Sequence, residues 1–183
     1  TLVINCHNYG DITGVNAVGG IVGYGRAGGI ISYCENNGVV TGSHNVGGIS
    51  GENRSNIDNS VNNGIVKVSA SGAGHWIGGI AGMSGSSATI SSCENNGDVV
   101  GIGSTTGGVG GIVGGLYGAL STCVNNGNVT GKYYLGGIAG SLQNANASVS
   151  DSINNGTIST TVTSGTVNLG CIVGYNIGKI IGN

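Results

Sequence analysis

An internal repeat of about thirty residues runs from one end of this chain to the other. Its clearest block reads Gly-Gly-Ile-x-Gly and recurs with the first Gly at positions 19, 47, 78, 110, 136 and 170. The last copy has Cys171 in place of the second Gly. Insertions fall between blocks, as in 69–76 and 159–168. Repeats whose gaps alone vary in length are typical of solenoids, in which each repeat packs only on its neighbours.

Two further blocks precede each Gly-Gly segment in a fixed order. One is an aliphatic leader followed three positions later by Cys or Ser, and the other is Asn-x-Gly-x-(Ile/Val). The leaders are Val3, Ile31, Ile57, Ile90, Leu120, Val149 and finally Ile181. The Asn column comprises Asn8, Asn36, Asn62, Asn95, Asn125 and Asn154. All these blocks are short, rich in Ile and Val, and bounded by Gly, Asn or Ser, which is typical of strands.

The repeat therefore predicts an all-β fold, a right-handed parallel β-helix (β-solenoid) of about six turns of roughly thirty residues with three short strands each. Equivalent residues then stack about 4.8 Å apart, giving aliphatic columns and an Asn column whose amides can hydrogen-bond to one another. The Gly after each Asn-x is expected to take a positive φ at a corner. A β-propeller is the alternative, but its blades need about forty residues and four strands.

Residues 1–183 are predicted to form a single repeat domain. Both ends fall inside the leader strand, and neither shows the polar cap that solenoids normally need. We therefore expect a fragment of a longer chain, or ends that associate end to end with another copy.

Composition excludes several classes of function. Gly accounts for 41 residues but Pro for none, which excludes collagen. Lys and Arg total 5 and the net charge is −2, so no binding to nucleic acid is expected. Gly or polar residues interrupt every apolar run, so no membrane insertion is expected.

No catalytic residue, metal site or cofactor is predicted. Glu35 and Glu94 share a column two turns apart, or roughly 10 Å, which is near the carboxylate spacing of inverting glycosidases. They are interpreted as solvated surface acids, with Val61 between them. His44 and His75 stand on adjacent turns without a visible third ligand.

The Cys residues follow the repeat as well. Four of them share one column, at Cys6, Cys34, Cys93 and Cys123, and Ser fills the gaps. They are interpreted as small buried thiols that fill a tight column. The stacking distance would also permit a 6–34 or a 93–123 disulfide.

One copy of the repeat reads GGIVG at 19–23, GIISYC at 29–34 and GVVTG at 38–42. It resembles the GLUG repeat, roughly GGLVG, GxIxNC and GxVxG, and six copies cover essentially the whole chain. The resemblance implies a segment of a large bacterial cell-surface or secreted protein. Such repeats occur in adhesin-like proteins and beside the catalytic domain of some bacterial immunoglobulin A metalloproteases. Ile replaces the usual Leu here, and the HExxH motif is absent, so no protease activity is implied.

Candidate ligand-binding residues lie in the loops before the Gly-Gly segments: His44, His75, Trp76, Tyr133 and Tyr134. Trp and Tyr rings can stack on sugars or anchor protein contacts. We expect a non-enzymatic, extracellular stalk or scaffold of the bacterial cell surface that acts as an adhesin. The alternative is a carbohydrate- or protein-binding module that uses this aromatic edge, and a polysaccharide-cleaving enzyme is less favoured. The expected partners are a host or cell-surface glycan or protein and the flanking domains of the parent protein.

Overall fold

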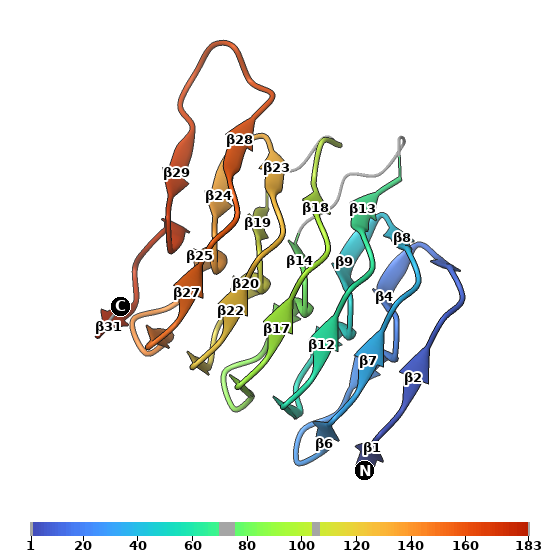
Figure 1. The fold of residues 1–183 in the computed structure, drawn as a ribbon. Coiled ribbons are helices and arrows are strands. Elements are labelled where there is room, and N and C mark those ends of the chain that lie inside the picture. Colours follow the sequence, from blue (N-terminus) through green and yellow to red (C-terminus); the bar gives the residue numbers. More distant parts are fainter. Residues whose placement is uncertain (1, 70–75, 104–106, 183) are drawn as a thin grey trace.

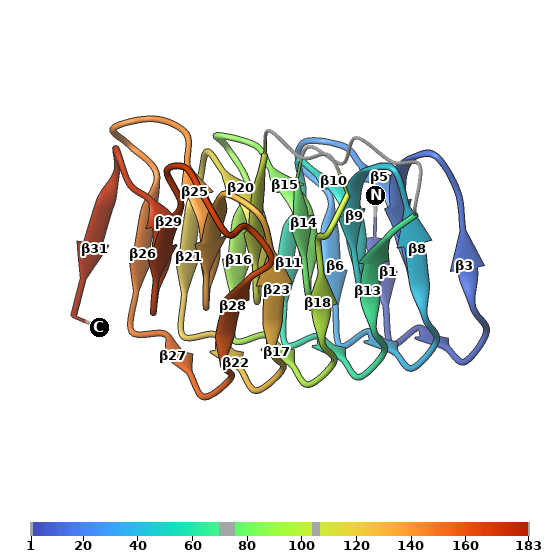
Figure 2. The same cartoon turned by 90° about the horizontal axis from the view of Figure 1, so that it is seen from above.

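The computed structural model describes residues 2–69, 76–103 and 107–182. Over these residues the chain winds into a parallel β-solenoid, in which residues paired between successive turns lie 26 to 34 positions apart. Figure 1 shows the turns stacked in sequence order, with the two chain ends at opposite ends of the stack, and Figure 2 shows the same stack from above. The predicted all-β parallel solenoid is therefore confirmed.

Each complete turn contributes one strand to each of five parallel sheets. Sheet A contains β1 (Leu2–Ile4), β6 (Ile30–Ser32), β11 (Asn56–Asp58), β16 (Thr89–Ser91), β21 (Ala119–Ser121), β26 (Ser148–Ser150) and β31 (Lys179–Ile181). Sheet B contains β2 (His7–Asn8), β7 (Glu35–Asn36), β12 (Val61–Asn62), β17 (Glu94–Asn95), β22 (Val124–Asn125) and β27 (Ile153–Asn154). Sheet C contains β3 (Ile12–Thr13), β8 (Val40–Gly42), β13 (Val66–Val68), β18 (Val99–Val100), β23 (Val129–Gly131) and β28 (Ile158–Thr160).

Sheets D and E complete the turn. Sheet D contains β4 (Asn16–Gly19), β9 (His44–Gly47), β14 (Ile77–Gly78), β19 (Gly108–Gly110), β24 (Tyr134–Gly136) and β29 (Asn168–Gly170). Sheet E contains β5 (Val22–Gly25), β10 (Ser50–Asn53), β15 (Ala81–Ser84), β20 (Val113–Leu116), β25 (Ala139–Leu142) and β30 (Val173–Tyr175). None of the described residues forms a helix that could cross a membrane.

Two details of the predicted turn are corrected. Each turn has five strands and not three, because the Asn block bends into the separate strands of sheets B and C and the Gly-Gly segment separates sheet D from sheet E. Many of these strands have only two residues, which is too short to give a pattern in the sequence. The register of the last turn also differs by one position, since Val149 pairs with Ile180 and not with Ile181.

The corner between sheets A and B is built without glycine. One residue at each corner has a φ between 47° and 56°: Asn5, Tyr33, Asn59, Ser92, Thr122 and Asp151. The Cys or Ser that follows donates its side-chain hydrogen to the carbonyl two residues earlier, as Cys93 does to Ser91 at 3.2 Å and Ser60 to Asp58 at 2.9 Å. The thiol and the hydroxyl therefore make the same hydrogen bond at this corner, which explains why both Cys and Ser occur in the column.

The predicted Asn ladder is present and runs unbroken from Asn8 to Asn154. Each side-chain Nδ2 donates to Oδ1 of the Asn in the next turn at 2.7 to 2.8 Å. The same nitrogen also donates to the carbonyl of the Gly two residues later, as Asn62 does to Gly64. Asn36, Asn62, Asn95 and Asn125 are fully buried, and these bonds satisfy amides that would otherwise be costly to bury.

The glycines of the Asn-x-Gly corner do not have the positive φ that the sequence suggested. They are needed because successive turns approach too closely for a side chain. A Cβ built on Gly38 would overlap the carbonyl of Gly10, and one on Gly64 would overlap the carbonyl of Gly38. The same relation recurs up the stack at Gly97, Gly127 and Gly156.

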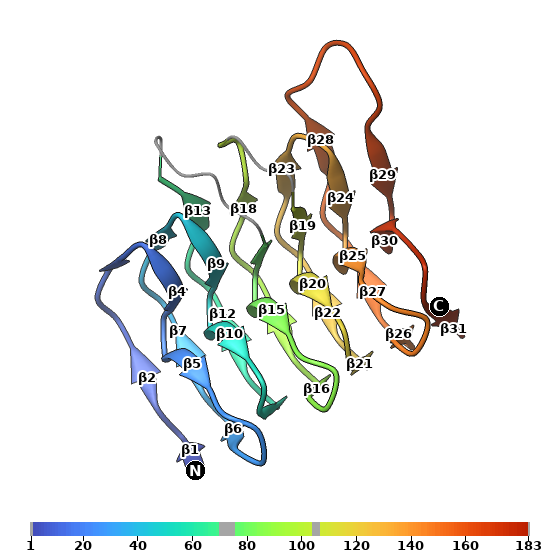
Figure 3. The same ribbon diagram turned by 180° about the vertical axis from the view of Figure 1, so that it is seen from behind.

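The Gly-Gly-Ile-x-Gly block forms an arch that folds into the interior. The second Gly lies at its tip, where a Cβ on Gly48 would overlap the side chain of Asn62 in the buried ladder. The last Gly lies in the arm, where a Cβ on Gly51 would overlap the backbone of Ala17 and Val18. Sheets D and E therefore touch through their backbones, and in Figure 3 each strand of sheet D leads into one of sheet E, as β9 into β10.

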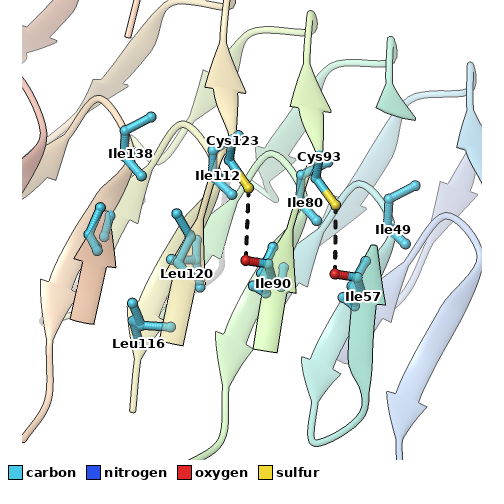
Figure 4. Close-up of a cluster of buried hydrophobic side chains, with 14 of the residues drawn as sticks. Ile49, Ile57, Ile80, Ile90, Cys93, Ile112, Leu116, Leu120, Cys123 and Ile138 are labelled. Atoms are coloured by element: carbon cyan, nitrogen blue, oxygen red, sulfur yellow. Dashed lines mark hydrogen bonds between the residues drawn. The ribbon is translucent and has the colours of Figure 1, made fainter. Parts of the chain in front are cut away.

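The arch divides the interior into two hydrophobic cores. One lies between sheets A and E and contains the Ile of each Gly-Gly block, with Ile49, Ile80, Ile112 and Ile138 fully buried (Figure 4). The other lies between sheets C and D and contains the Val columns of those sheets, such as Val40 and Val46. The Ile column of the Gly-Gly blocks and the Val column of sheet C were predicted from the repeat, whereas the column of sheet D and the arch that separates the two cores were not.

Candidate functional site

A cleft of about 510 Å³ lies where sheets D and E meet at the surface of the first three turns. Its lining residues are Asn16, Ala17, His44, Asn45, Glu52 and Trp76. Four of them come from β4 and β9, one from β10, and Trp76 directly precedes β14. Ala17 and Asn45 both have a φ of 49°, so the wall of the cleft contains two left-handed residues that are not glycine.

Trp76 is held in place from two directions. Its ring lies against Gly115 of β20, where an added Cβ would come within 2.7 Å of the ring atoms. Its ring also meets that of Tyr117 edge to face, with centroids 6.1 Å apart at 88°. Because Gly115 has no side chain, the Trp76 ring can pack directly against the backbone at that position.

The carboxylate of Glu52 is oriented by a neighbouring cation. Arg54 donates from Nε and Nη2 to Oε1 of Glu52, at 3.1 and 3.0 Å. The guanidinium also lies over the ring of Tyr24, 5.6 Å from its centroid. Because both bonds go to Oε1, the second oxygen of Glu52 keeps its capacity to accept a hydrogen bond.

The predicted ligand-binding residues do not all come together. His44 and Trp76 line the same cleft, whereas Tyr133 and Tyr134 line a separate hollow of about 200 Å³ with Thr166 and Asn168. Tyr134 packs on Tyr175 with ring centroids 5.2 Å apart. His75 lies outside the described residues. The sequence suggested one aromatic edge, but the structure has two separate hollows. The turn that carries Gly108 lies between them.

The structure also shows cleft residues that the sequence did not single out. Glu52 and Asn45 line the cleft, and Arg54 and Tyr117 hold its parts in position. Arg54 and Tyr117 also line a second hollow of about 390 Å³ with Met83. Asn45, Glu52 and Arg54 come from one turn and Tyr117 from another, and the residue types at these positions do not repeat. A search for repeated columns therefore could not reveal them.

The acidic pair considered for catalysis is arranged as expected. Glu35 and Glu94 both pair with Val61, so one turn separates them. Each carboxylate accepts from a surface amide at 2.9 Å, Glu35 from Asn63 and Glu94 from Asn126. Glu35 also lies 3.2 Å from Nδ1 of His7. Among the described residues, no three His, Cys, Asp or Glu side chains gather as a metal site would require.

The Cys column is in the thiol form, and three of its members are buried. Cys34, Cys93 and Cys123 are buried as predicted, whereas Cys6 at the end of the column is exposed. Figure 4 shows the Cys93 and Cys123 thiols directed toward carbonyls of sheet A, at 3.9 and 4.0 Å. The hydrogen bond that Cys93 donates to Cys123, followed by burial, raises the pKa of Cys93 well above its ordinary value, and the same bond lowers the pKa of Cys123. These thiols are therefore packing groups of the core and not exposed nucleophiles.

Comparison with known proteins supports the fold and leaves the family open. No family model matches the chain, and no curated protein matches it either. The chain is similar to the crystal structure of a "putative immunoglobulin A1 protease" from Bacteroides ovatus, with a TM-score of 0.59 and 23% sequence identity. The similarity covers 99% of this chain and 67% of that protein. It shows a shared solenoid fold, and the resemblance to GLUG repeats stays a prediction.

Proposed function

We propose that this chain is a non-enzymatic repeat domain of an extracellular bacterial surface protein, where it acts as a rigid stalk and adhesin. The observation that carries the proposal is the axial ladder of buried Asn side chains, which ties every turn to the next. Because each amide bonds to both neighbouring turns, one turn cannot shift without breaking bonds to the others. Such a stack is suited to holding other parts of a protein at a fixed distance.

Two further observations support a scaffold over an enzyme. Only 7% of the residues are charged, and the acids Glu35 and Glu94 are engaged with surface amides outside the cleft. The protein that shares this fold carries a protease name, but the HExxH sequence is absent here. We propose that the chain stands beside functional domains of its parent protein, and that copies can also associate end to end.

A second candidate function is a binding module, and the arrangement around Trp76 favours it. A fixed indole next to a carboxylate and amides is the kind of site that binds a sugar or a peptide side chain. A host or cell-surface glycan or protein is the proposed partner of such a site. This function is compatible with a stalk, because a repeat domain can both space and bind.

The extracellular placement is tested by treating intact cells of the producing organism with a protease that cannot enter them. Loss of the chain from intact cells is expected. A chain that stays intact until the cells are lysed, and is degraded afterwards, would contradict the placement.

The non-enzymatic proposal is tested by incubating the purified chain with polysaccharides and with immunoglobulin A. No cleavage is expected, and cleavage that disappears in Glu35→Gln or Glu94→Gln would overturn it.

A further inference from the structure

We infer that the cleft between sheets D and E binds a neutral saccharide, with Trp76 as the stacking platform and Glu52 and Asn45 as hydrogen-bonding partners. This inference rests on the second candidate function and deepens it, because it commits to one site and to neutral saccharides as the class of ligand. It also differs from the aromatic edge expected from the sequence, since it excludes Tyr133 and Tyr134 and includes residues of β9 and β10.

The size of the cleft sets the size of its occupant. Its volume of about 510 Å³ falls within the range of about 300–1,000 Å³ that is usual for small-ligand sites. A stable protein interface needs about 800 Å² on each partner. Six lining residues from three strands and one adjoining position suit one or two sugar units better than a protein surface.

The indole of Trp76 is organised before any ligand arrives. Gly115 and Tyr117 restrict the ring, so little side-chain entropy remains to be lost on binding. Trp presents a large apolar face that can cover the C–H face of a pyranose. The structure therefore supplies the apolar half of a sugar site at no further cost in ordering.

The polar half comes from Glu52 and Asn45. Arg54 orients Glu52 through Oε1, so Oε2 can accept a hydrogen bond from a sugar hydroxyl. Oδ1 of Asn45 is buried in the cleft wall and has no hydrogen-bond partner among the described residues. A buried oxygen without a hydrogen-bond partner is unfavourable. Rotation of the amide about its last torsion, which is soft, would offer a donor and an acceptor to a ligand.

The charge of the cleft selects a neutral sugar. Glu52 is the one carboxylate among the lining residues, and none of them is Lys or Arg. The nearby Arg54 is already paired with Glu52. A uronate or a sulfated sugar would therefore find no unpaired Lys or Arg among the lining residues to neutralise its charge.

The test uses the fact that Trp76 is the single Trp of the chain, so its fluorescence reports this cleft alone. The probes are neutral oligomers of glucose, galactose, mannose and N-acetylhexosamines, with uronate oligomers, sulfated oligosaccharides and short peptides beside them. Saturable change in emission with at least one neutral oligomer is expected, with the same affinity by calorimetry. Circular dichroism of the same samples establishes that the solenoid is folded.

Variants locate the binding. Trp76→Ala is expected to weaken it about tenfold or more, by removing the stacking face. Glu52→Gln and Gly115→Ala are also expected to weaken it, the first by removing a charged acceptor and the second by displacing the ring. Tyr9→Ala and Glu94→Gln change an exposed ring and a half-buried acid elsewhere, and are expected to leave the affinity unchanged.

Three results would overturn the inference: folded wild-type chain that binds no neutral oligomer, binding that survives Trp76→Ala, or binding of anionic oligomers or peptides alone. None of them touches the stalk proposal, because that proposal depends on the ladders and on the cell-surface location. Loss of folding in wild-type chain would instead count against the solenoid itself.

Discussion

At the scale of single residues, the glycines of the Asn-x-Gly corner are required by contact between turns and not by a left-handed backbone. Gly10 and Gly64 occupy the same place in the repeat, but their surroundings differ. A Cβ on Gly64 would overlap the carbonyl of Gly38, whereas one on Gly10 would meet nothing closer than 3.9 Å. The two positions form a matched pair that separates crowding from local conformation.

We expect Gly64→Ala to destabilise the chain by about 3 kcal/mol or more, or to prevent folding, because the turns would have to move apart and break the Asn ladder. Gly10→Ala is expected to change the free energy of unfolding by less than about 1 kcal/mol. Urea denaturation followed by circular dichroism measures both. Equal losses at the two positions would show that crowding is not the reason for Gly.

The buried Asn ladder gives a second prediction at this scale. Asn95→Ala removes the partner of Asn62 and leaves Oδ1 of Asn125 buried without its donor. We expect a loss of about 2–4 kcal/mol in the free energy of unfolding. Asn96 belongs to a parallel ladder on the surface, where Asn96→Ala is expected to cost below about 1 kcal/mol because water replaces the lost bonds. Similar losses in the two variants would contradict this account of the ladder.

At the scale of elements, the corner between sheets A and B accepts either Cys or Ser, because either side chain can donate to the carbonyl two residues earlier in its own turn. Ser60 and Ser152 occupy the place that Cys93 takes in its own turn, and Ser152 donates to Ser150 at 2.8 Å. Cys93→Ser should therefore keep the corner intact. The thiol adds a dependence on pH that the hydroxyl does not have.

Cys93 makes stability depend on alkaline pH. Its pKa is raised in the folded state by the hydrogen bond that it donates to Cys123 and by burial, so the unfolded chain loses this proton at a lower pH than the folded chain does. The same bond lowers the pKa of Cys123, so the comparison uses a variant that replaces Cys93 alone. The stability tied to the protonated thiol is full below about pH 8.5, the ordinary Cys value, and is lost as pH rises above it. With reducing agent present, the urea midpoint should fall more between pH 8 and pH 10 in wild type than in Cys93→Ser. Equal falls would refute the link to this thiol.

At the scale of the whole molecule, the repeat predicted the stack well, because a solenoid puts identical residues in identical surroundings. The aliphatic columns and the Asn ladder follow directly from that. The left-handed corner was missed because residues as different as Tyr33 and Asp151 share only a backbone angle. The cleft was recovered in part, since His44 and Trp76 were named, but Glu52 and Tyr117 owe their roles to contacts across turns at positions that do not repeat.

The inward arch determines the architecture of the whole molecule, because it divides the core and places sheets D and E together to form the cleft. It brings residues of different turns into backbone contact, including Gly51 with Val18, Gly82 with Val46 and Gly114 with Ile77. A nuclear Overhauser spectrum of the isotope-labelled chain tests these contacts directly. We predict strong cross-peaks from the Hα protons of Gly51, Gly82 and Gly114 to the amide protons of Val18, Val46 and Ile77. A folded chain in which these glycines show cross-peaks to sequence neighbours alone would contradict the arch.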